Sequence, residues 1–200
     1  MKNKTLVFVD TETSGLYPEQ NHEILEVCCI KVYPTGQEEK LYLKAKLESG
    51  CFSTVALELN GYKTRDWSGA VSQRNLAVTL SGFLKGCVLV GHNVQFDRDF
   101  IEETWCRFGI ETYLDRRQID TQVLAFEHLV PLGLQSISMD SIRDFLGWST
   151  LANHTAAVDC EQMKQLFYYL LRFPWYSRLS LWARLRFSAW LRWVRVKVKV

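Results

Sequence analysis

The sequence predicts an α/β fold, with a mixed central sheet flanked by helices. Three strand-like apolar segments come first, a short turn joins the second to the third, and helical patterns then alternate with short apolar segments. Strands joined by so short a turn pair antiparallel, whereas strands separated by helices pair parallel. With 200 residues, 48% hydrophobic and 23% charged, the chain fits one globular domain. This composition excludes disordered, collagen-like and coiled-coil chains.

The elements follow from periodicity and turn signals. The predicted strands are Leu6–Asp10, Ile24–Val32, Leu41–Leu47 after a turn at Pro34 to Gly36, Val88–Val90 and a short one at Ile119. The predicted helices are Ser53–Leu59, Gln73–Leu84, about Gln95–Phe108, Gln122–Leu129, Ser138–Leu146 and Ala156–Leu171. A short apolar run predicts a buried strand, and apolar residues spaced three and four apart predict a helix.

Charge divides the chain into two parts. Residues 1–171 carry 16 Lys and Arg against all 22 acids, a net charge of −6, whereas residues 172–200 carry eight Lys and Arg and no acid. We therefore expect an acidic globular domain over 1–171 and a basic, Trp/Arg-rich tail over 172–200.

The tail has four interpretations. Its arginines and tryptophans could hold single-stranded nucleic acid, bind a protein, dock on an anionic membrane, or pack on the body with the arginines in solvent. A helical stripe is poorly formed, and Pro174 separates the tail from the helix before it. Packing or partner binding is favoured over membrane contact.

Cysteines and apolar segments bear on the compartment. The six cysteines form no C-x-x-C pair, which argues against a zinc site or a secreted disulfide framework. The apolar run near the start is too short for a signal peptide, and no uncharged stretch has the length of a membrane span. The expected location is cytoplasmic.

Four acids stand where apolar residues are expected. Asp10 and Glu12 follow a buried strand and, two residues apart, share one face at its carboxyl end, with Gly15 allowing a tight turn behind them. Asp97 begins a helical stripe that continues through Ile101, and Asp159 begins one that continues through Met163.

These acids predict a metal centre. Burying an unpaired carboxylate costs several kcal/mol of folding free energy. The basic residues nearby in sequence fall on other helix faces; they are Arg98, Arg107 and Lys164. Four carboxylates without an evident buried base suit two Mg²⁺ or Mn²⁺ ions. His154, five residues before Asp159, could accept a proton from attacking water. The chemistry indicated is phosphodiester hydrolysis.

These residues resemble the DEDDh 3′→5′ exonucleases, the family of the proofreading subunit of bacterial replicative DNA polymerase. The three motifs are matched by Val9–Leu16 (VDTETSGL), Gly91–Asp97 (GHNVQFD) and His154-x-Ala156-x-x-Asp159, and the similarity runs from about Leu6 to Leu171. The resemblance implies a ribonuclease H-like fold. It also implies metal binding by Asp10, Glu12, Asp97 and Asp159, with His154 as general base.

The resemblance further implies how substrate is held. Thr13, Ser14, Gly15 and Leu16 would meet the 3′-terminal nucleotide, Leu16 and Phe96 would press on terminal bases, and Asn93 would help hold the strand. The expected substrate is a single-stranded DNA 3′ end, read without base specificity, with release of nucleoside monophosphates. In the family's proofreading subunit the chain beyond the catalytic domain holds the polymerase, so the tail is a candidate for such a contact.

Alternative interpretations stay open. The same site could act on RNA, since no residue that reads a 2′-hydroxyl is evident, or the fold could serve as a non-catalytic adaptor for nucleic acid or membrane. Two nearby residues have structural explanations: His92, beside an apolar strand, fits a hydrogen-bonded core histidine, and Asp120 fits a helix cap.

Overall fold

The computed structural model describes residues 4–148 and 155–172, and it confirms the α/β fold. A five-stranded mixed sheet has the order β3-β2-β1-β4-β5. β2 pairs antiparallel with both β1 and β3, whereas β4 pairs parallel with β1 and β5. The strands are β1 (Leu6–Thr13), β2 (Ile24–Val32), β3 (Glu38–Lys44), β4 (Val88–Gly91) and β5 (Gln118–Asp120).

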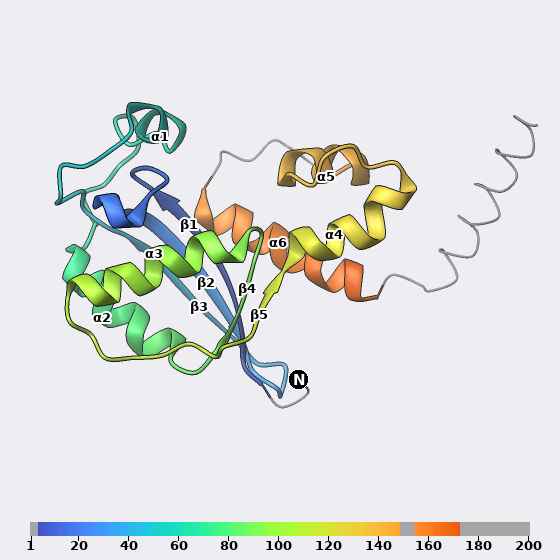
Figure 1. The fold of residues 1–200 in the computed structure, drawn as a ribbon, viewed down its shortest axis with the longest axis horizontal. Helices are drawn as coiled ribbons and strands as arrows, with labels where there is room; N and C mark the ends of the chain where they lie inside the picture. The colour runs from blue at the N-terminus through green and yellow to red at the C-terminus, as the bar shows by residue number, and fades with distance from the viewer. Residues whose placement is uncertain (1–3, 149–154, 173–200) are drawn as a thin grey trace, which may run out of the picture.

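Helices cover both faces of the sheet (Figure 1). α2 (Gln73–Leu84) and α3 (Val94–Arg107) share one apolar core with the sheet, and α6 (Ala156–Leu171) packs on the opposite face. α4 (Thr121–Leu129) and α5 (Met139–Leu146) pack on α6 through a third apolar cluster. The remaining elements are α1 (Thr54–Leu59) and two short 3-10 helices, η1 (Pro18–Gln20) and η2 (Val130–Leu132).

The predicted third strand was misplaced. The sequence alternation suggested Leu41–Leu47, but β3 begins at Glu38 and ends at Lys44. The reason is the hairpin register, in which Val32 pairs with Glu38 and Glu26 with Lys44. Backbone pairing with β2 begins directly after the turn, so the charged residues at the start of β3 enter the sheet at its edge, where they reach solvent.

Helix boundaries follow the sequence closely because polar caps fix their first turns. Ser53, Ser72, Ser138 and Thr155 each accept a hydrogen bond from a backbone N–H of the first turn. As a result α2 and α6 span the predicted residues. Within residues 4–148 and 155–172 no helix combines the length and apolarity that crossing a bilayer requires.

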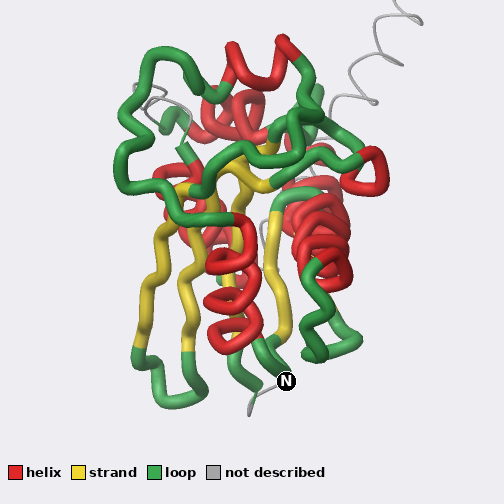
Figure 2. The backbone as a smooth tube through the Cα atoms, turned by 90° about the vertical axis from the view of Figure 1, so that its left-hand side faces the viewer, coloured by secondary structure: helices red, strands yellow, loops and turns green. Residues whose placement is uncertain are grey.

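The central strand sends alternate side chains to the two faces. Val7 and Val9 join the core under α2 and α3, whereas Phe8 joins the core under α6. Asp10 and Glu12 continue the Phe8 series. β1 runs from the end of the sheet near the N-terminus to the end where the long loops gather (Figure 2), so both acids lie at the loop-rich end, on the α6 side.

Candidate active site and metal centre

Three carboxylates from two elements converge at this end of the sheet. Ligand oxygens of Asp10, Glu12 and Asp159 all lie within 4.8 Å of one another. Asp159 belongs to the first turn of α6, and Met163, Leu166, Phe167 and Leu170 on the same stripe are buried. The apolar stripe holds α6 against the sheet, and so places Asp159 over the carboxyl end of β1.

The fourth acid, Asp97, approaches from the other face of β1. Asp97 lies in the first turn of α3, is buried, and accepts a hydrogen bond of 2.7 Å from the Thr11 hydroxyl. Thr11 lies between Asp10 and Glu12 on β1 and therefore points away from them. Asp97 is outside the group of three within 4.8 Å, yet its charge raises the pKa of Asp10 more than the charge of any other residue does.

Burial and mutual repulsion disfavour the charged forms of these acids. Desolvation, followed by the charges of Asp97, Glu12 and Asp159, raises the pKa of Asp10 well above its ordinary value. Desolvation, then Asp159 and Glu26, raises the pKa of Glu12 to about 7. Desolvation likewise raises the pKa of Asp97 to about 7, although the Thr11 hydrogen bond opposes it. For Glu12 and Asp97, desolvation outweighs the nearby groups that favour the charged form, Arg65 and the Thr11 hydroxyl.

This donor set fits a hard divalent cation. Among the described residues, neither Asp10 nor Glu12 forms an ion pair. Carboxylate oxygens gathered within 4.8 Å of one another are the ligands that Mg²⁺ and Mn²⁺ prefer. A bound cation would remove the repulsion that raises their pKa values.

A buried base beside the site corrects one expectation. The sequence offered no evident buried Lys or Arg, but Arg143 of α5 is buried and forms an ion pair with Asp159. It was missed because α5 and α6 meet only in the tertiary structure. The sequence signal was an arginine on the core stripe of α5, next to Ile142, but spacing gave no reason to pair it with Asp159.

Glu26, another buried acid, lies directly across from Glu12 in the β1–β2 pairing. Like charges opposite one another destabilise a sheet, and here Glu26 is neutralised. Its carboxylate lies 2.6 Å from an Arg65 nitrogen and accepts a hydrogen bond of 2.9 Å from the Tyr42 hydroxyl. The ladder shifts register between Glu12 and Thr13, which ends the regular strand at the site.

The loop after β1 carries the residues expected to meet substrate. Leu16 is 65% exposed, whereas Thr13, Ser14 and Gly15 are buried. The Ser14 hydroxyl donates to the Cys51 carbonyl and accepts from the Glu23 backbone N–H, both at 2.9 Å. A side chain at Gly15 would overlap the His22 ring, because an added Cβ would meet it at 2.4 Å. Inside the protein, these residues shape the loop that presents Leu16.

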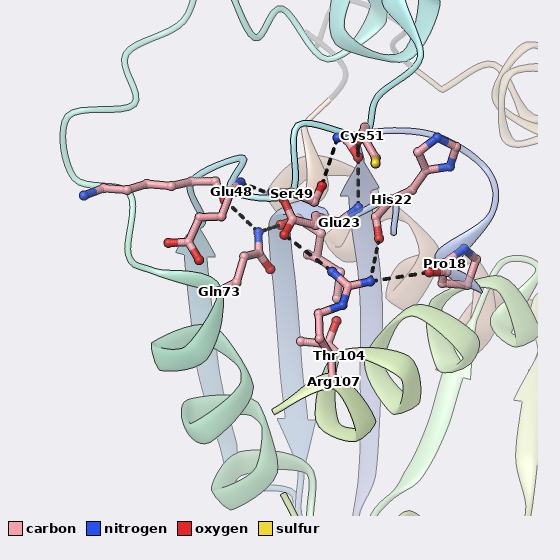
Figure 3. A network of polar contacts seen from close by, with 12 residues as sticks. Pro18, His22, Glu23, Glu48, Ser49, Cys51, Gln73, Thr104 and Arg107 are labelled. Carbon is pink, nitrogen blue, oxygen red and sulfur yellow. Dashed lines mark hydrogen bonds and ion pairs between the residues drawn. The ribbon is translucent and has the colours of Figure 1, made fainter. Parts of the chain in front are cut away.

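A polar network centred on Glu23 anchors this loop (Figure 3). The Glu23 carboxylate accepts hydrogen bonds from the backbone N–H groups of Glu48 and Ser49, at 2.7 and 3.0 Å, and lies 3.4 Å from Arg107. Gln73 donates to the Ile24 and Lys46 carbonyls, both at 2.8 Å. The network ties the β1–β2 connection to the segment before α1 and to α3.

The second motif forms the β4–α3 turn. A side chain at Gly91 would come within 2.9 Å of the Val94 Cα, and Asn93 adopts a left-handed backbone with φ of 70°. The exposed Asn93 donates its backbone N–H to Asp120 at 3.1 Å, and the half-buried Phe96 packs on Phe100 with ring centroids 4.9 Å apart.

Two predictions of structural roles are confirmed. The His92 ring nitrogens lie 2.9 Å from the Thr121 hydroxyl and 2.8 Å from the Ile137 carbonyl, so the ring bridges α4 and the segment before α5. Asp120 accepts a hydrogen bond from the Gln122 backbone N–H at 2.8 Å and caps α4. The proposed general base, His154, and residues 173–200 of the tail lie outside the described residues.

The sequence matches a known family over most of its length. Residues 7–167 match the family RNase_T, described as Exonuclease. The match contains all four acids of the candidate site.

Two bacterial relatives give the same picture. The chain is 30% identical to the PolC-type DNA polymerase III of Thermotoga petrophila over 166 residues, which are 83% of this chain and 12% of that protein. It is 28% identical to the DNA polymerase III subunit epsilon of Buchnera aphidicola over 112 residues, 52% of this chain and 45% of that one. The chain thus spans only a minor part of the relatives it matches.

The fold is shared with a solved nuclease. Exonuclease I of E. coli, crystallised with a dT13 oligonucleotide, superposes with a TM-score of 0.68 over 88% of this chain and 42% of that one, at 17% identity. At this identity the likeness establishes the ribonuclease H-like fold of the chain.

Proposed function

The chain belongs to the exonuclease family matched by residues 7–167, and on that premise we propose that it is a metal-dependent 3′→5′ exonuclease. Its substrate would be the 3′ end of single-stranded DNA, from which hydrolysis of the terminal phosphodiester bond releases a nucleoside monophosphate. One observation carries the proposal: three carboxylates, those of Asp10, Glu12 and Asp159, meet within 4.8 Å at the end of the central strand.

The carboxylates would hold the metal. Asp10, Glu12 and Asp159 share one side of β1 and would bind the first ion, whereas Asp97, on the other side, would act on the second through Asp10 or a water molecule. Bound Mg²⁺ or Mn²⁺ would stabilise the charge on the attacking and leaving oxygens of the displacement.

Side chains of the protein would accept and release the protons of the reaction. His154, five residues before Asp159, would accept a proton from the attacking water. The raised pKa values of Asp10, Glu12 and Asp97 mean that the metal-free site retains protons near neutral pH, and these leave when a cation binds.

Substrate contacts would come from the loop after β1 and the start of α3. Leu16, which is 65% exposed, and the half-buried Phe96 would press on the terminal bases, and the exposed Asn93 would help hold the strand. Thr13, Ser14 and Gly15 would meet the terminal nucleotide, and the hydroxyls of Thr13 and Ser14, which are bonded within the protein, would fix the shape of the loop. An apolar contact with a base face tolerates any sequence.

Relatives suggest a partner. The similar segments belong to replicative polymerases or a polymerase subunit, so we propose that a polymerase or another protein contacts the tail, residues 172–200, beyond a catalytic domain over 1–171. The proposed compartment is the cytoplasm, as the absence of paired cysteine motifs in the sequence indicates.

The test is digestion of 5′-labelled oligonucleotides. Single-stranded DNA, single-stranded RNA and duplex DNA are incubated with the full chain in Mg²⁺, Mn²⁺ or EDTA, with Asp10→Asn as the control. A ladder that shortens from the 3′ end of DNA only with metal, and not with the variant, supports the proposal. Faster loss of RNA would reassign the substrate, and binding without cleavage would favour an adaptor.

A further inference from the structure

The buried base beside the site is held on three sides. Arg143 projects from α5 with a side chain only 6% exposed. Its Nε donates to Gln162 at 2.5 Å, its Nη1 donates to Asp140 at 2.7 Å, and its Nη2 donates to Oδ1 of Asp159. All three nitrogens of the guanidinium therefore have a partner, which is the geometry in which arginine fixes a carboxylate most firmly.

The contact with Asp159 is not needed to neutralise the arginine. Asp140, three residues earlier on α5 and 69% exposed on its side chain, already supplies a counter-charge. Gln162, one turn along α6 from Asp159, supplies an acceptor. Arg143 is thus held in place by groups outside the carboxylate cluster, and its positive charge is presented to one member of that cluster.

We infer that Arg143 is a built-in counter-cation of the carboxylate cluster, which sets the site's affinity for divalent metal. It occupies Oδ1 of Asp159 and offsets one of the three negative charges, so a metal ion meets a weaker field and shares Asp159 with the arginine. The inference rests on the proposed function, because it assumes that Asp10, Glu12 and Asp159 hold a cation. Arg143 is here a positioning residue.

This arrangement has two physical consequences. Without metal, Arg143 reduces repulsion among the three acids and helps the site stay folded. With metal, the fixed positive charge repels the incoming ion at short range, where screening by solvent is weak. Removing the charge should therefore tighten metal binding, whereas loss of an ordinary structural contact would leave it unchanged or weaken it.

The experiment is Mn²⁺ titration by calorimetry on the full chain. Arg143→Gln should bind Mn²⁺ at least about tenfold more tightly than the wild-type chain, equivalent to about 1.4 kcal/mol. Arg143→Lys retains the charge and should stay within about twofold of wild type, since charge sets the effect. Lys164→Gln is the matched control: it removes a cation from α6 that pairs with Glu38 and Glu161, and it should leave the affinity unchanged.

A second variant works in the opposite direction and disturbs the fold less. Asp140→Asn removes the exposed counter-charge and leaves Arg143 with Asp159 as its only carboxylate partner among the described residues. Mn²⁺ binding should then weaken about two- to threefold, since the arginine interacts more strongly with Asp159. If Arg143→Gln does not fold, this variant still decides the question.

Outcomes separate the inference from the proposed function. If the wild-type chain binds Mn²⁺ through Asp10, and neither Arg143→Gln nor Asp140→Asn changes the affinity as stated, the inference is wrong and the proposed function stands. If Arg143→Gln binds Mn²⁺ but the wild-type chain does not, the inference holds, and the proposal that the natural chain is a metal-dependent enzyme is wrong. If no variant binds, both are overturned.

Discussion

Two acidic regions lie at the same end of the sheet, and their carboxylates have opposite kinds of surroundings. Glu23 is 3% exposed and receives two backbone N–H donors and an arginine. Asp10 and Glu12, only one strand connection away, receive no such partner among the described residues, and their pKa values are raised. The first region is complete within the chain, whereas the second is complete only with a cation.

The comparison shows how a structural acid differs from a functional one. Burial alone does not distinguish them, because both regions are desolvated. The difference lies in whether protein donors satisfy the carboxylate. Substitutions in the two regions should therefore have opposite effects on stability and activity.

The largest effect is expected on activity in the carboxylate cluster. Asp10→Asn should lower the rate of 3′ digestion at least about a thousandfold, because each metal contact is worth several kcal/mol in the transition state. The metal-free variant should be as stable as wild type or more so, since one of the repelling charges is gone. Digestion rate and thermal unfolding in EDTA measure the two effects. Full activity would refute the assignment of Asp10.

The reverse result is expected in the Glu23 network. Glu23→Gln leaves Arg107 without its counter-charge and should lower the free energy of unfolding by about 2–3 kcal/mol. Digestion per folded molecule should change far less than with Asp10→Asn. Urea unfolding followed by circular dichroism measures the stability. An unchanged unfolding midpoint would show that the network does not anchor the loop.

The pH dependence of stability sharpens the comparison. The pKa values of Glu12 and Asp97 are about 7 in the metal-free fold, above their unfolded values, so between about pH 4.5 and 7 the native state binds more protons than the unfolded state. Stability should be greatest at the acidic side of this window and fall by several kcal/mol as the pH rises through it.

Two controls belong to that measurement. Glu12→Gln should flatten the profile, and saturating Mn²⁺ should do the same, because the cation replaces the protons. A metal-free profile that rises toward pH 7 would contradict the raised pKa values.

The smallest effect is expected where the carboxylate region does have a donor. Thr11→Val removes the hydroxyl that donates to Asp97, and should lower the free energy of unfolding at pH 8 by about 1 kcal/mol. At pH 5, where Asp97 carries its proton, the loss should be smaller. Thermal unfolding at the two pH values tests this, and an equal loss at both would show that Asp97 does not change its protonation state between them.

Much of this site could be predicted from local sequence. Asp10 and Glu12 share a face because a strand alternates every residue, and Asp159 faces the sheet because it heads an apolar helical stripe. The helix limits were predictable where a serine or threonine caps the first turn, as at Ser72 and Thr155. The third strand was misplaced because its limits depend on the register with β2.

The amino-acid sequence by itself determined the α/β fold, the order of its elements and the four acids of the site, because each of these follows from periodicity within one segment. Only the tertiary structure decided which partners those acids receive. It places Asp97 across β1 from the other three, pairs Glu26 with Arg65, and brings Arg143 to Asp159. Such pairings join elements distant in the chain, and neither spacing nor composition encodes the distance between two side chains that meet only when the helices pack.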